Sequence, residues 1–383
     1  MKILHAVRQY PPGVGGIESY VSQLAALQAR AGHDVRVVTL DRIIDGDGQR
    51  LPSEETKHGV QVMRVPFVGS RRYPLAPHAL RHFREADIVH VHGVEFFADF
   101  AALTSGAHRR PLVLSTHGGI FHTRFAWHLK MLWFQTITRA TLRRYRFVLA
   151  SSVQDQGLFA RIAGAKVKLV ENAVNTERFA NASRLDAKRM IYFGRLAPNK
   201  GLETLITWFA AVRQLAPEWS LIIAGKEMGT QIASLRALAA SLGVEQAIQF
   251  RREPDDAALR ELIAECSTFV CASRFEGFGI AAVEAIGAGL FPVLSEIAPF
   301  QRTIERCGHG LCLDFASSET ARDFLIAFGD FARQPRSSAQ LRERLAPFRW
   351  DRVLDQTHLL YAEALQDRAG GARAMAAQIS EAL

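Results

Sequence analysis

Two cationic side chains stand in a short loop that leads into a helical pattern, at residues 194–201 (GRLAPNKG). Arg195 and Lys200 oppose the positive end of a helix dipole there, which is unfavourable unless an anion lies between them. With an anion bound, the N–H groups of the helix start and both cations converge on it. An apolar run precedes the loop, so the pattern favours phosphate binding over a surface loop with two solvated charges.

Two carboxylates, Glu276 and Glu284, stand eight residues apart in a second glycine-containing stretch, EGFGIAAVE. Gly277 and Gly279 allow the backbone to approach a ligand closely. Carboxylates are strong acceptors for vicinal hydroxyls, so the pair could hold a sugar and a ribose. The two groups could instead be the acid and base of a glycosidase, but the phosphate-binding loop upstream disfavours that interpretation.

Further candidates lie in the first half of the chain. Gly15 and Gly16 open a helical pattern and form a second anion candidate, although they match neither the GxGxxG nor the P-loop pattern. His117 follows an apolar run directly and precedes two glycines, which places it at a strand end. His90 and His92 alternate on one strand face, and we interpret them as residues that line a cleft rather than as metal ligands.

The sequence predicts no metal site and no cofactor beyond the substrates. The DGD at 45–47 has the form of a metal-binding motif, but its Gly- and Asp-rich surroundings predict a turn. Cys266, Cys271, Cys307 and Cys312 have no histidine at finger-like spacing after them. We expect all four to be small buried apolar residues rather than zinc ligands.

The elements that must position these residues follow one pattern in both halves. An apolar run, a glycine-containing loop, a helical pattern and a second apolar run begin at residue 3 and again at residue 190, as in the βαβ unit of a parallel sheet. Further apolar runs lie at 88–91, 112–115, 147–150, 168–170, 269–272 and 291–294. Strands that alternate with helices predict an α/β fold of two Rossmann-like, doubly wound domains.

The length of 383 residues also favours two domains, and 48% hydrophobic residues exclude a disordered chain. We place an N-terminal domain at 1–175, a polar linker at 172–188 and a C-terminal domain at 188–351. The helical pattern at about 352–383 is expected to pack back on the first domain. Because ligands bind beyond the carboxyl ends of strands in such sheets, we expect the site in the cleft between the domains.

Positive charge is concentrated in the first half of the chain. Residues 1–180 carry 24 Lys and Arg against 14 Asp and Glu, whereas the remaining residues carry 23 against 24. Between Asp99 and Asp155 there are eight basic residues and no acidic one. Such asymmetry predicts an anionic partner, either nucleic acid, a membrane surface or a phosphorylated substrate. No nucleic-acid-binding module is recognised, so we expect no nucleic acid.

Residues 121–145 combine aromatic and apolar side chains with Arg and Lys. This composition is typical of a helix that lies on an anionic membrane surface, and a buried helix is the alternative. No apolar run reaches the length of a membrane span, and the N-terminus lacks a signal-peptide core. We therefore expect a cytoplasmic protein that is peripheral on the inner face of the cell membrane.

These loops together resemble the retaining glycosyltransferases of family 4, which have the GT-B fold. The resemblance rests on Gly15-Gly16, His117, the loop at 194–201 and the spacing Glu276-x7-Glu284, in the family order over nearly the whole chain. Within the family, the chain is most similar to bacterial exopolysaccharide α-mannosyltransferases of the xanthan and acetan type. The stretches that carry this closer similarity are VRQYPPGVGGIE, VVTLDR, STHGGIFHT, WFQTITR and FGIAAVEA.

The resemblance implies a reaction and a role for each candidate residue. Such enzymes move mannose from GDP-mannose to a polyprenyl-diphosphate-linked cellobiose, with retention and without a metal. A leaving phosphate oxygen takes the acceptor proton during same-face attack. The resemblance assigns catalysis to His117, Arg195, Lys200 and Glu276. It assigns donor binding to Gly15, Gly16, Arg195, Lys200, Gly277, Phe278, Gly279, Ile280 and Glu284.

Among these, Gly16 and the two cations would contact the donor diphosphate. Glu276 and His117 would contact the transferred sugar, and Glu284 the ribose. The residues themselves leave the base, the sugar, the acceptor and the oligomeric state open.

Alternatives remain at two levels. Within the family, the donor could be a UDP-sugar (glucose, galactose or N-acetylglucosamine) and the acceptor another lipid-linked oligosaccharide or a lipopolysaccharide. In a different class, the chain could be a nucleotide-sugar epimerase or a non-catalytic nucleotide-sugar-binding protein. The full set of candidate residues argues against a binding protein without activity.

Overall fold

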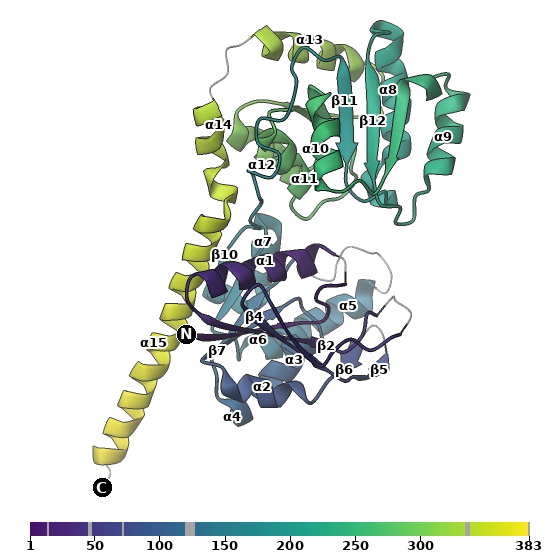
Figure 1. Cartoon of the computed structure of the whole chain (residues 1–383). Coiled ribbons are helices and arrows are strands. Elements are labelled where there is room, and N and C mark those ends of the chain that lie inside the picture. The colour runs from purple at the N-terminus through teal and green to yellow at the C-terminus, as the bar shows by residue number, and fades with distance from the viewer. Residues whose placement is uncertain (14, 45–47, 71–72, 119–126, 334–337, 382–383) are drawn as a thin grey trace. The chain divides into compact units, whose positions relative to one another are not determined.

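The computed structural model describes residues 1–383 except 14, 45–47, 71–72, 119–126, 334–337 and 382–383. The chain forms two compact units (Figure 1). The first unit joins Met1–Ala173 to Trp350–Leu383, and the second is Val174–Arg349. Each unit is built on a largely parallel sheet with helices on its faces, so the predicted α/β class with two Rossmann-like domains is confirmed.

The first unit contains an eight-stranded sheet in the order β10-β9-β8-β7-β1-β2-β4-β3, in which only the β3–β4 pair is antiparallel. Its central strands are buried on both sides, as expected where helices cover both faces. The strands are β1 (Lys2–Val7), β2 (Asp34–Leu40), β3 (Glu54–Lys57), β4 (Val60–Val65), β7 (Ile88–His92), β8 (Leu112–Ser115), β9 (Phe147–Ala150) and β10 (Val167–Leu169). A separate hairpin pairs β5 (Val68–Ser70) with β6 (Tyr73–Leu75).

Helices connect most of the strands of this unit, but β2 to β6 follow one another without a helix between them. The helices are α1 (Gly16–Arg30), α2 (Ala79–Glu85), α3 (Phe96–Leu103), α4 (Ser105–His108), α5 (Trp127–Trp133), the π-helix η1 (Phe134–Thr138), α6 (Arg139–Leu142), α7 (Val153–Ala163) and the short η2 (Gly164–Lys166). Side chains of β1 alternate between two cores. Ile3 and Val7 pack with α1 on one face, whereas Leu4 and Ala6 pack with α2, α3 and α7 on the other.

The long helix α15 (Trp350–Glu381) follows the second unit in sequence but belongs to the first. Its Val353, Leu360 and Tyr361 are buried in the same core as α1 and β1. The Gln356 amide donates a hydrogen bond of 2.8 Å to the carbonyl of Leu169. The face of the sheet that carries Ile3 and Val7 is therefore covered by two helices from opposite ends of the chain.

The second unit contains a six-stranded, wholly parallel sheet in the order β13-β12-β11-β14-β15-β16. The strands are β11 (Arg189–Phe193), β12 (Ser220–Gly225), β13 (Ile248–Arg252), β14 (Thr268–Cys271), β15 (Phe291–Ser295) and β16 (Leu311–Leu313). The helices are η3 (Pro198–Lys200), α8 (Leu202–Leu215), α9 (Ile232–Ser241), η4 (Glu245–Ala247), α10 (Asp256–Ala264), α11 (Ile280–Gly287), α12 (Ala298–Cys307), α13 (Thr320–Arg333), α14 (Ser338–Leu345) and η5 (Ala346–Phe348). Apolar side chains of these strands and helices form one large core that includes the buried Trp208 and Trp219.

The stretch that the sequence analysis treats as a linker, 172–188, is largely part of the second unit. Phe179 is 1% exposed and packs in the core of that unit, and Val174 packs in a smaller core beside η5. The amide N–H of Ser183 donates to the carbonyl of Ala288. The polar composition of 172–188 does not indicate that this stretch packs against the second unit. Only a few of its residues are buried, and its backbone makes part of the contacts.

Strand order fixes where each loop emerges. In the sheet, β12 and β13 lie on one side of β11, and β14, β15 and β16 lie on the other side. The loops after β11 and β14 therefore flank the point where the order reverses, which is where ligands bind in open α/β sheets. Within the described ranges, no helix is both long enough and apolar enough to cross a membrane.

Candidate active site

The loops after β11 and β14 bring one cation and one carboxylate into contact. Lys200 ends η3, and its Nζ lies 2.5 Å from Oε1 of Glu276 in the loop after β14. Ser273 donates a second hydrogen bond of 2.7 Å to the same carboxylate oxygen. The side chains of Lys200 and Glu276 are 14% and 13% exposed, so the pair is largely buried between the two loops.

Backbone contacts hold these two loops together. The Asn199 side chain donates to the carbonyl of Phe275 at 3.1 Å, and the amide of Arg274 donates to the carbonyl of Asn199 at 2.8 Å. Gly201 has a φ of +63°, and a Cβ there would lie 2.3 Å from the carbonyl oxygen of Ala272. Glycine is required at this position because the left-handed backbone and the close approach coincide.

Arg195 supplies a second cation on the same loop. Its side chain is exposed, and no hydrogen bond or ion pair joins it to another described residue. Its carbonyl accepts a hydrogen bond of 2.8 Å from the buried Tyr192, which fixes the backbone that carries it. Since Glu276 offsets the charge of Lys200, Arg195 leaves this loop with a net positive charge for an anion.

The start of α11 completes the set of candidate residues in this unit. Gly279 precedes the helix with a φ of +89°, and a Cβ there would collide with Phe300. A Cβ at Gly277 would meet nothing within 4 Å, and Ile280 is exposed. Phe278 packs edge-on against Phe348. Helix α11 begins at Ile280, and the first N–H groups of a helix lack partners four residues earlier within the helix, the arrangement that anions favour.

Glu284 lies on α11 and has a partner that sequence reasoning missed. Its Oε1 is 2.9 Å from the guanidinium of Arg178, which also binds Asp256. Burial raises the pKa of Glu284, and the charge of Arg178 opposes that rise. The hydrogen bond from Arg178 lowers the pKa of Asp256. Arg178 stands 106 positions before Glu284 in the supposed linker, so no sequence spacing signals the pair.

In the first unit, Gly15 and Gly16 stand at the start of α1. Gly15 is the N-cap with an extended backbone, and a Cβ on Gly16 would meet nothing within 4 Å. No packing constraint explains glycine at position 16. The space beside Gly16 suits backbone contact with an anion, whereas beside Gly15 the carboxylate of Glu18 lies against the helix start.

His117 occupies an unusual backbone conformation in the loop after β8. Its φ is +49°, a region that residues other than glycine seldom adopt, and such strain is often found at functional sites. The ring packs edge-on against Tyr20 of α1, with ring centroids 5.0 Å apart. Tyr20 thereby links His117 to the helix that begins at Gly16. Burial lowers the pKa of His117 to about 4, so its imidazole is neutral at pH 7.

Asp155 holds the loop of His117 and was not singled out from the sequence. Its Oδ2 accepts hydrogen bonds from the hydroxyls of Thr116 and Ser151 and from the amide of Gly118, at 2.7–2.8 Å. Asp155 is itself fixed in the first turn of α7, where its amide donates to the capping Ser152. The pattern Ser152-x-x-Asp155 is a capping-box signal that could have drawn attention to it.

The interpretation of His90 and His92 as cleft-lining residues is wrong. They are 1% and 2% exposed, because they lie on the sheet face that α1 and α15 cover. Together with His5 they form the one metal-capable group found among the described residues. The DGD at 45–47 lies outside the described residues. All four cysteines are free thiols, and three of them are buried.

The basic and aromatic segment is partly buried and partly exposed over its described residues, 127–145. Phe134, Leu142 and Tyr145 pack into the core of the first unit. Leu129, Leu132, Trp133 and Ile137 are 41–64% exposed, and Arg139, Arg143 and Arg144 are exposed beside them. Residues 121–126 lie outside the described ranges. The described part is therefore a helical segment that buries one apolar side and has an apolar and cationic outer face.

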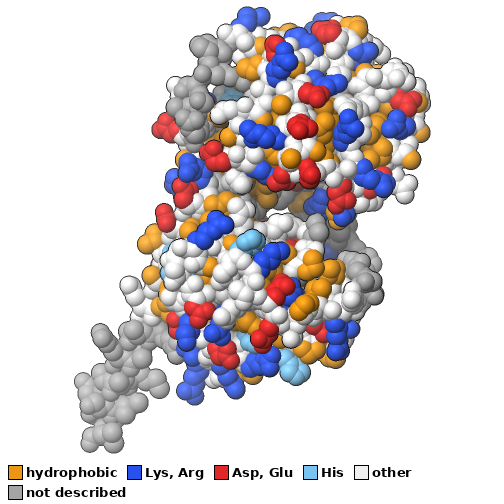
Figure 2. All heavy atoms as spheres, in the orientation of Figure 1, with side chains coloured by type: hydrophobic (Ala, Val, Ile, Leu, Met, Phe, Trp, Pro, Cys, Tyr) orange, Lys and Arg blue, Asp and Glu red, His pale blue; other side chains and the backbone are white. Residues whose placement is uncertain are grey.

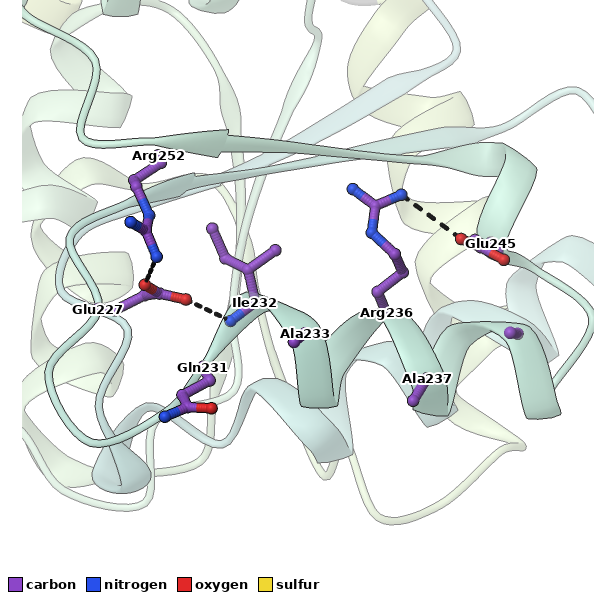
Figure 3. Close-up of a pocket in the computed structure, with 9 residues that line it drawn as sticks. Glu227, Gln231, Ile232, Ala233, Arg236, Ala237, Glu245 and Arg252 are labelled. Atoms are coloured by element: carbon purple, nitrogen blue, oxygen red, sulfur yellow. Dashed lines mark hydrogen bonds and ion pairs between the residues drawn. The ribbon is translucent and has the colours of Figure 1, made fainter.

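On the face shown in Figure 2, cationic and anionic side chains are intermingled over both units. A groove of about 760 Å³ lies between α9 and the end of β13 (Figure 3). Glu227 binds Arg252 there and accepts a hydrogen bond of 2.7 Å from the amide of Ile232. This groove adjoins the ends of β12 and β13, at residues 225–227 and 251–252.

Two family models match the chain. The "Glycosyl transferase 4-like domain" model matches residues 15–173, and the "Glycosyl transferases group 1" model matches residues 173–329. Their junction at residue 173 coincides with the end of the first segment of the first unit. Each model thus corresponds to one of the two structural units.

Similar proteins extend over nearly the whole chain. A "GDP-mannose:cellobiosyl-diphosphopolyprenol alpha-mannosyltransferase" of Xanthomonas oryzae is 43% identical, over 84% of this chain and 86% of its own length. The protein of the same name from Komagataeibacter xylinus is 38% identical, over 95% and 94%. The solved structure of HepE from Anabaena in complex with UDP has a TM-score of 0.73 at 21% identity, and covers 95% of this chain and 100% of that one. This structural likeness shows the fold.

Proposed function

The chain belongs to the group 1 glycosyltransferases, and from that premise we propose that it transfers mannose from GDP-mannose to a polyprenyl-diphosphate-linked cellobiose, forming an α-linkage. The names of the relatives at 38–43% identity support this donor and acceptor. The observation that carries the proposal is the pair Lys200–Glu276 beside the unpaired Arg195. Such a site supplies a carboxylate that can accept hydrogen bonds from sugar hydroxyls, and cations that can bind a diphosphate.

Each residue has a defined role in this proposal. Arg195, Lys200 and the backbone N–H groups at the starts of α1 and α11 bind the diphosphate. They stabilise the charge that develops on it as the leaving group, which is usually the largest catalytic contribution. Glu276 accepts hydrogen bonds from sugar hydroxyls, Glu284 from the ribose, and His117 contacts the transferred sugar.

The reaction proceeds with retention in this proposal. The acceptor hydroxyl oxygen forms a bond to the anomeric carbon on the same face from which the phosphate departs. The bond between the anomeric carbon and the phosphate oxygen breaks, and that oxygen takes the hydroxyl proton. Two cations and two helix starts neutralise the diphosphate, so the proposal includes no metal.

The apolar and cationic outer face of α5, η1 and α6 supports binding to an anionic membrane. Exposed leucines and a tryptophan enter the acyl boundary, while the arginines contact anionic headgroups. An acceptor with a polyprenyl tail resides in a membrane, so this face brings the enzyme to its substrate. We include in the proposal a peripheral location at the inner face of the cell membrane.

Calorimetric titration of the full chain with GDP, UDP and ADP in EDTA tests the donor. We expect GDP to bind and the other two to bind at least tenfold more weakly. A preference for UDP would keep a glycosyltransferase but overturn mannose as the transferred sugar. A loss of GDP binding in EDTA would overturn the metal-free site.

A further inference from the structure

A row of buried imidazoles runs from helix α1 to the loop of His117. Nε2 of His5 lies 2.7 Å from Oε1 of Gln28, and Nδ1 of His5 lies 2.9 Å from Nε2 of His92. Nδ1 of His92 in turn lies 3.0 Å from Nε2 of His117. Gln28 and His5 are 0% exposed and His92 is 2% exposed, so water does not interrupt the row.

The register of the sheet builds this row. His5 of β1 pairs with His90 of β7, and Val7 pairs with His92 two positions further on. The three histidines therefore share the face covered by α1 and α15. Gln28 reaches His5 from the last turns of α1, whereas His117 reaches His92 from the end of β8.

The contacts determine which nitrogen of each ring carries the proton. A neutral imidazole has one N–H and one acceptor nitrogen, and the partner of one nitrogen sets the state of the other. Oε1 of Gln28 faces His5, while Nε2 of Gln28 is buried without a hydrogen-bond partner among the described residues. In this amide orientation the oxygen can only accept, so His5 is protonated at Nε2 and accepts at Nδ1. His92 then donates from Nε2 and accepts at Nδ1, and His117 donates from Nε2.

Neutrality of all members is required for this order, and burial supplies it. Burial lowers the pKa of His5 to about 4, as it does for His117. The pKa of His92 is lowered further by burial and by the neighbouring imidazoles. A charged member would donate from both nitrogens and break the sequence of donors and acceptors.

A metal ion is the alternative occupant of His5, His90 and His92, whose ring nitrogens lie within 4.8 Å of one another. The direct contact of 2.9 Å between His5 and His92 opposes it. Two nitrogens on one tetrahedral zinc stand about 3.3 Å apart, given bonds of roughly 2.0–2.1 Å. Both nitrogens of His90 also have partners, in Tyr361 and Ser115.

We propose that Gln28, His5 and His92 are positioning residues that hold His117 in the Nε2–H tautomer and leave its Nδ1 as an acceptor for a hydroxyl of the transferred sugar. This inference rests on the proposed contact between His117 and that sugar. Gln28 sets the direction of the whole row, because its reversal would turn every imidazole around. His117 would then present an N–H donor instead of an acceptor.

Nitrogen-15 NMR of the full chain labelled at histidine tests the tautomer without any substrate. Protonated and unprotonated ring nitrogens resonate in well-separated ranges, and His117→Asn assigns the signal. We expect Nε2–H at His117 in the parent protein and a mixture of tautomers in His92→Phe. The matched control is His90→Phe, on the same strand face and equally buried, which should leave the His117 tautomer unchanged.

Kinetics supply the second readout. Loss of the ordering contact should lower kcat roughly tenfold in His92→Phe, the equivalent of one hydrogen bond, with little change in GDP affinity. If His92→Phe does not fold, Gln28→Met tests the same row from α1 without altering the sheet. An Nδ1–H tautomer at His117, or one that His92→Phe and Gln28→Met leave unchanged, would overturn the proposal.

Titration with zinc distinguishes the metal alternative. Stoichiometric binding that shifts the signals of His5, His90 and His92 together would overturn the hydrogen-bonded row, and unchanged signals support it. The test also separates this inference from the proposed function. Failure to bind GDP or transfer mannose would leave the tautomer measurement intact and would overturn only the proposed reaction.

Discussion

Lys200 and Glu276 neutralise each other on two loops that only the second unit's strand order brings together. Removal of either charge leaves the other unpaired and, in the proposed function, takes a contact from the donor. We expect Lys200→Ala and Glu276→Ala each to lower kcat by about 100- to 1,000-fold, the range for loss of one group that stabilises developing charge. Steady-state transfer assays with GDP-mannose measure this.

Lys226→Ala is the matched control for that pair. Lys226 binds Glu253 in a similar ion pair on neighbouring loops, but both side chains are about half exposed. Exposed pairs contribute little to stability, so this variant should retain near-normal activity. An equal loss of kcat in Lys200→Ala and Lys226→Ala would contradict a specific role of Lys200.

Asp155 illustrates a residue that acts through its neighbours. Asp155→Asn replaces an oxygen that accepts three hydrogen bonds with a group that can present donors to the same partners. We expect about a tenfold loss of kcat, with the pKa and tautomer of His117 disturbed, because the strained loop is no longer held. Asp314→Asn, which changes an acceptor for the amide of Ala316 in the second unit, is the control.

Local sequence patterns singled out some residues of the candidate site and missed others, for a physical reason. Lys200, Glu276 and His117 follow strands directly, and the carboxyl-end rule needs only local patterns to find them. Arg178 and Asp155 act through partners that are distant in sequence or buried. The row from Gln28 to His117 depends on the register between β1 and β7, which periodicity does not encode.

At the scale of elements, the junction between β11 and α8 approaches the loop after β14 closely at Gly201. Gly201→Ala combines a left-handed backbone with a collision against the carbonyl of Ala272, so we expect a loss of about 3 kcal/mol or more in stability and weaker GDP binding. Gly243→Ala is matched, since its φ of +69° is similar but a Cβ meets nothing within 4 Å. That variant should lose only about 1–2 kcal/mol.

The helical segment α5–α6 carries the membrane prediction. Leu129→Ser combined with Leu132→Ser removes two exposed apolar side chains, and Arg143→Gln with Arg144→Gln removes two charges. We expect each pair to lower the fraction bound to anionic liposomes in co-sedimentation, and the arginine pair to lose its effect at high salt. Leu215→Ser, at a similarly exposed leucine of the second unit, should bind like the parent. Unchanged binding in both pairs would assign this face to another role.

The same segment shows why composition alone left two interpretations open. Apolar residues occur on both sides of this helix, because Phe134 and Leu142 serve the core while Leu129 and Leu132 face outward. A helix with one buried and one exposed apolar stripe has no single polar face. Its sequence therefore fits both a buried helix and a membrane-bound one.

At the scale of the whole molecule, the buried histidines tie the stability of the first unit to pH. The pKa of His5 and of His117 is about 4 in the folded chain, below the usual 6.5. The unfolded chain binds more protons between these values, so stability is full above about pH 6.5 and falls as the pH drops toward 4. His5 alone accounts for on the order of 3 kcal/mol of this loss.

Urea unfolding at pH 7.5 and pH 5, followed by hydrogen exchange of peptides from each unit, measures the effect. Peptides of the first unit should lose protection at lower urea at pH 5, whereas those of the second unit should shift less. An equal shift in both units would contradict the assignment to the histidine row. The variant His5→Leu, which removes one of these titrations, should show a smaller pH dependence than the parent.

The path of the chain through α15 has a consequence for biosynthesis. The second unit is one continuous segment and can fold as soon as it leaves the ribosome, but the first unit lacks Val353, Leu360 and Tyr361 until the residues after it have emerged. Until then the part of the eight-stranded sheet that α15 covers stays exposed during translation, and only α1 shields this face. Nascent chains stalled before residue 350 should therefore bind chaperones through the first unit. That unit is completed last, although most of it is synthesised first.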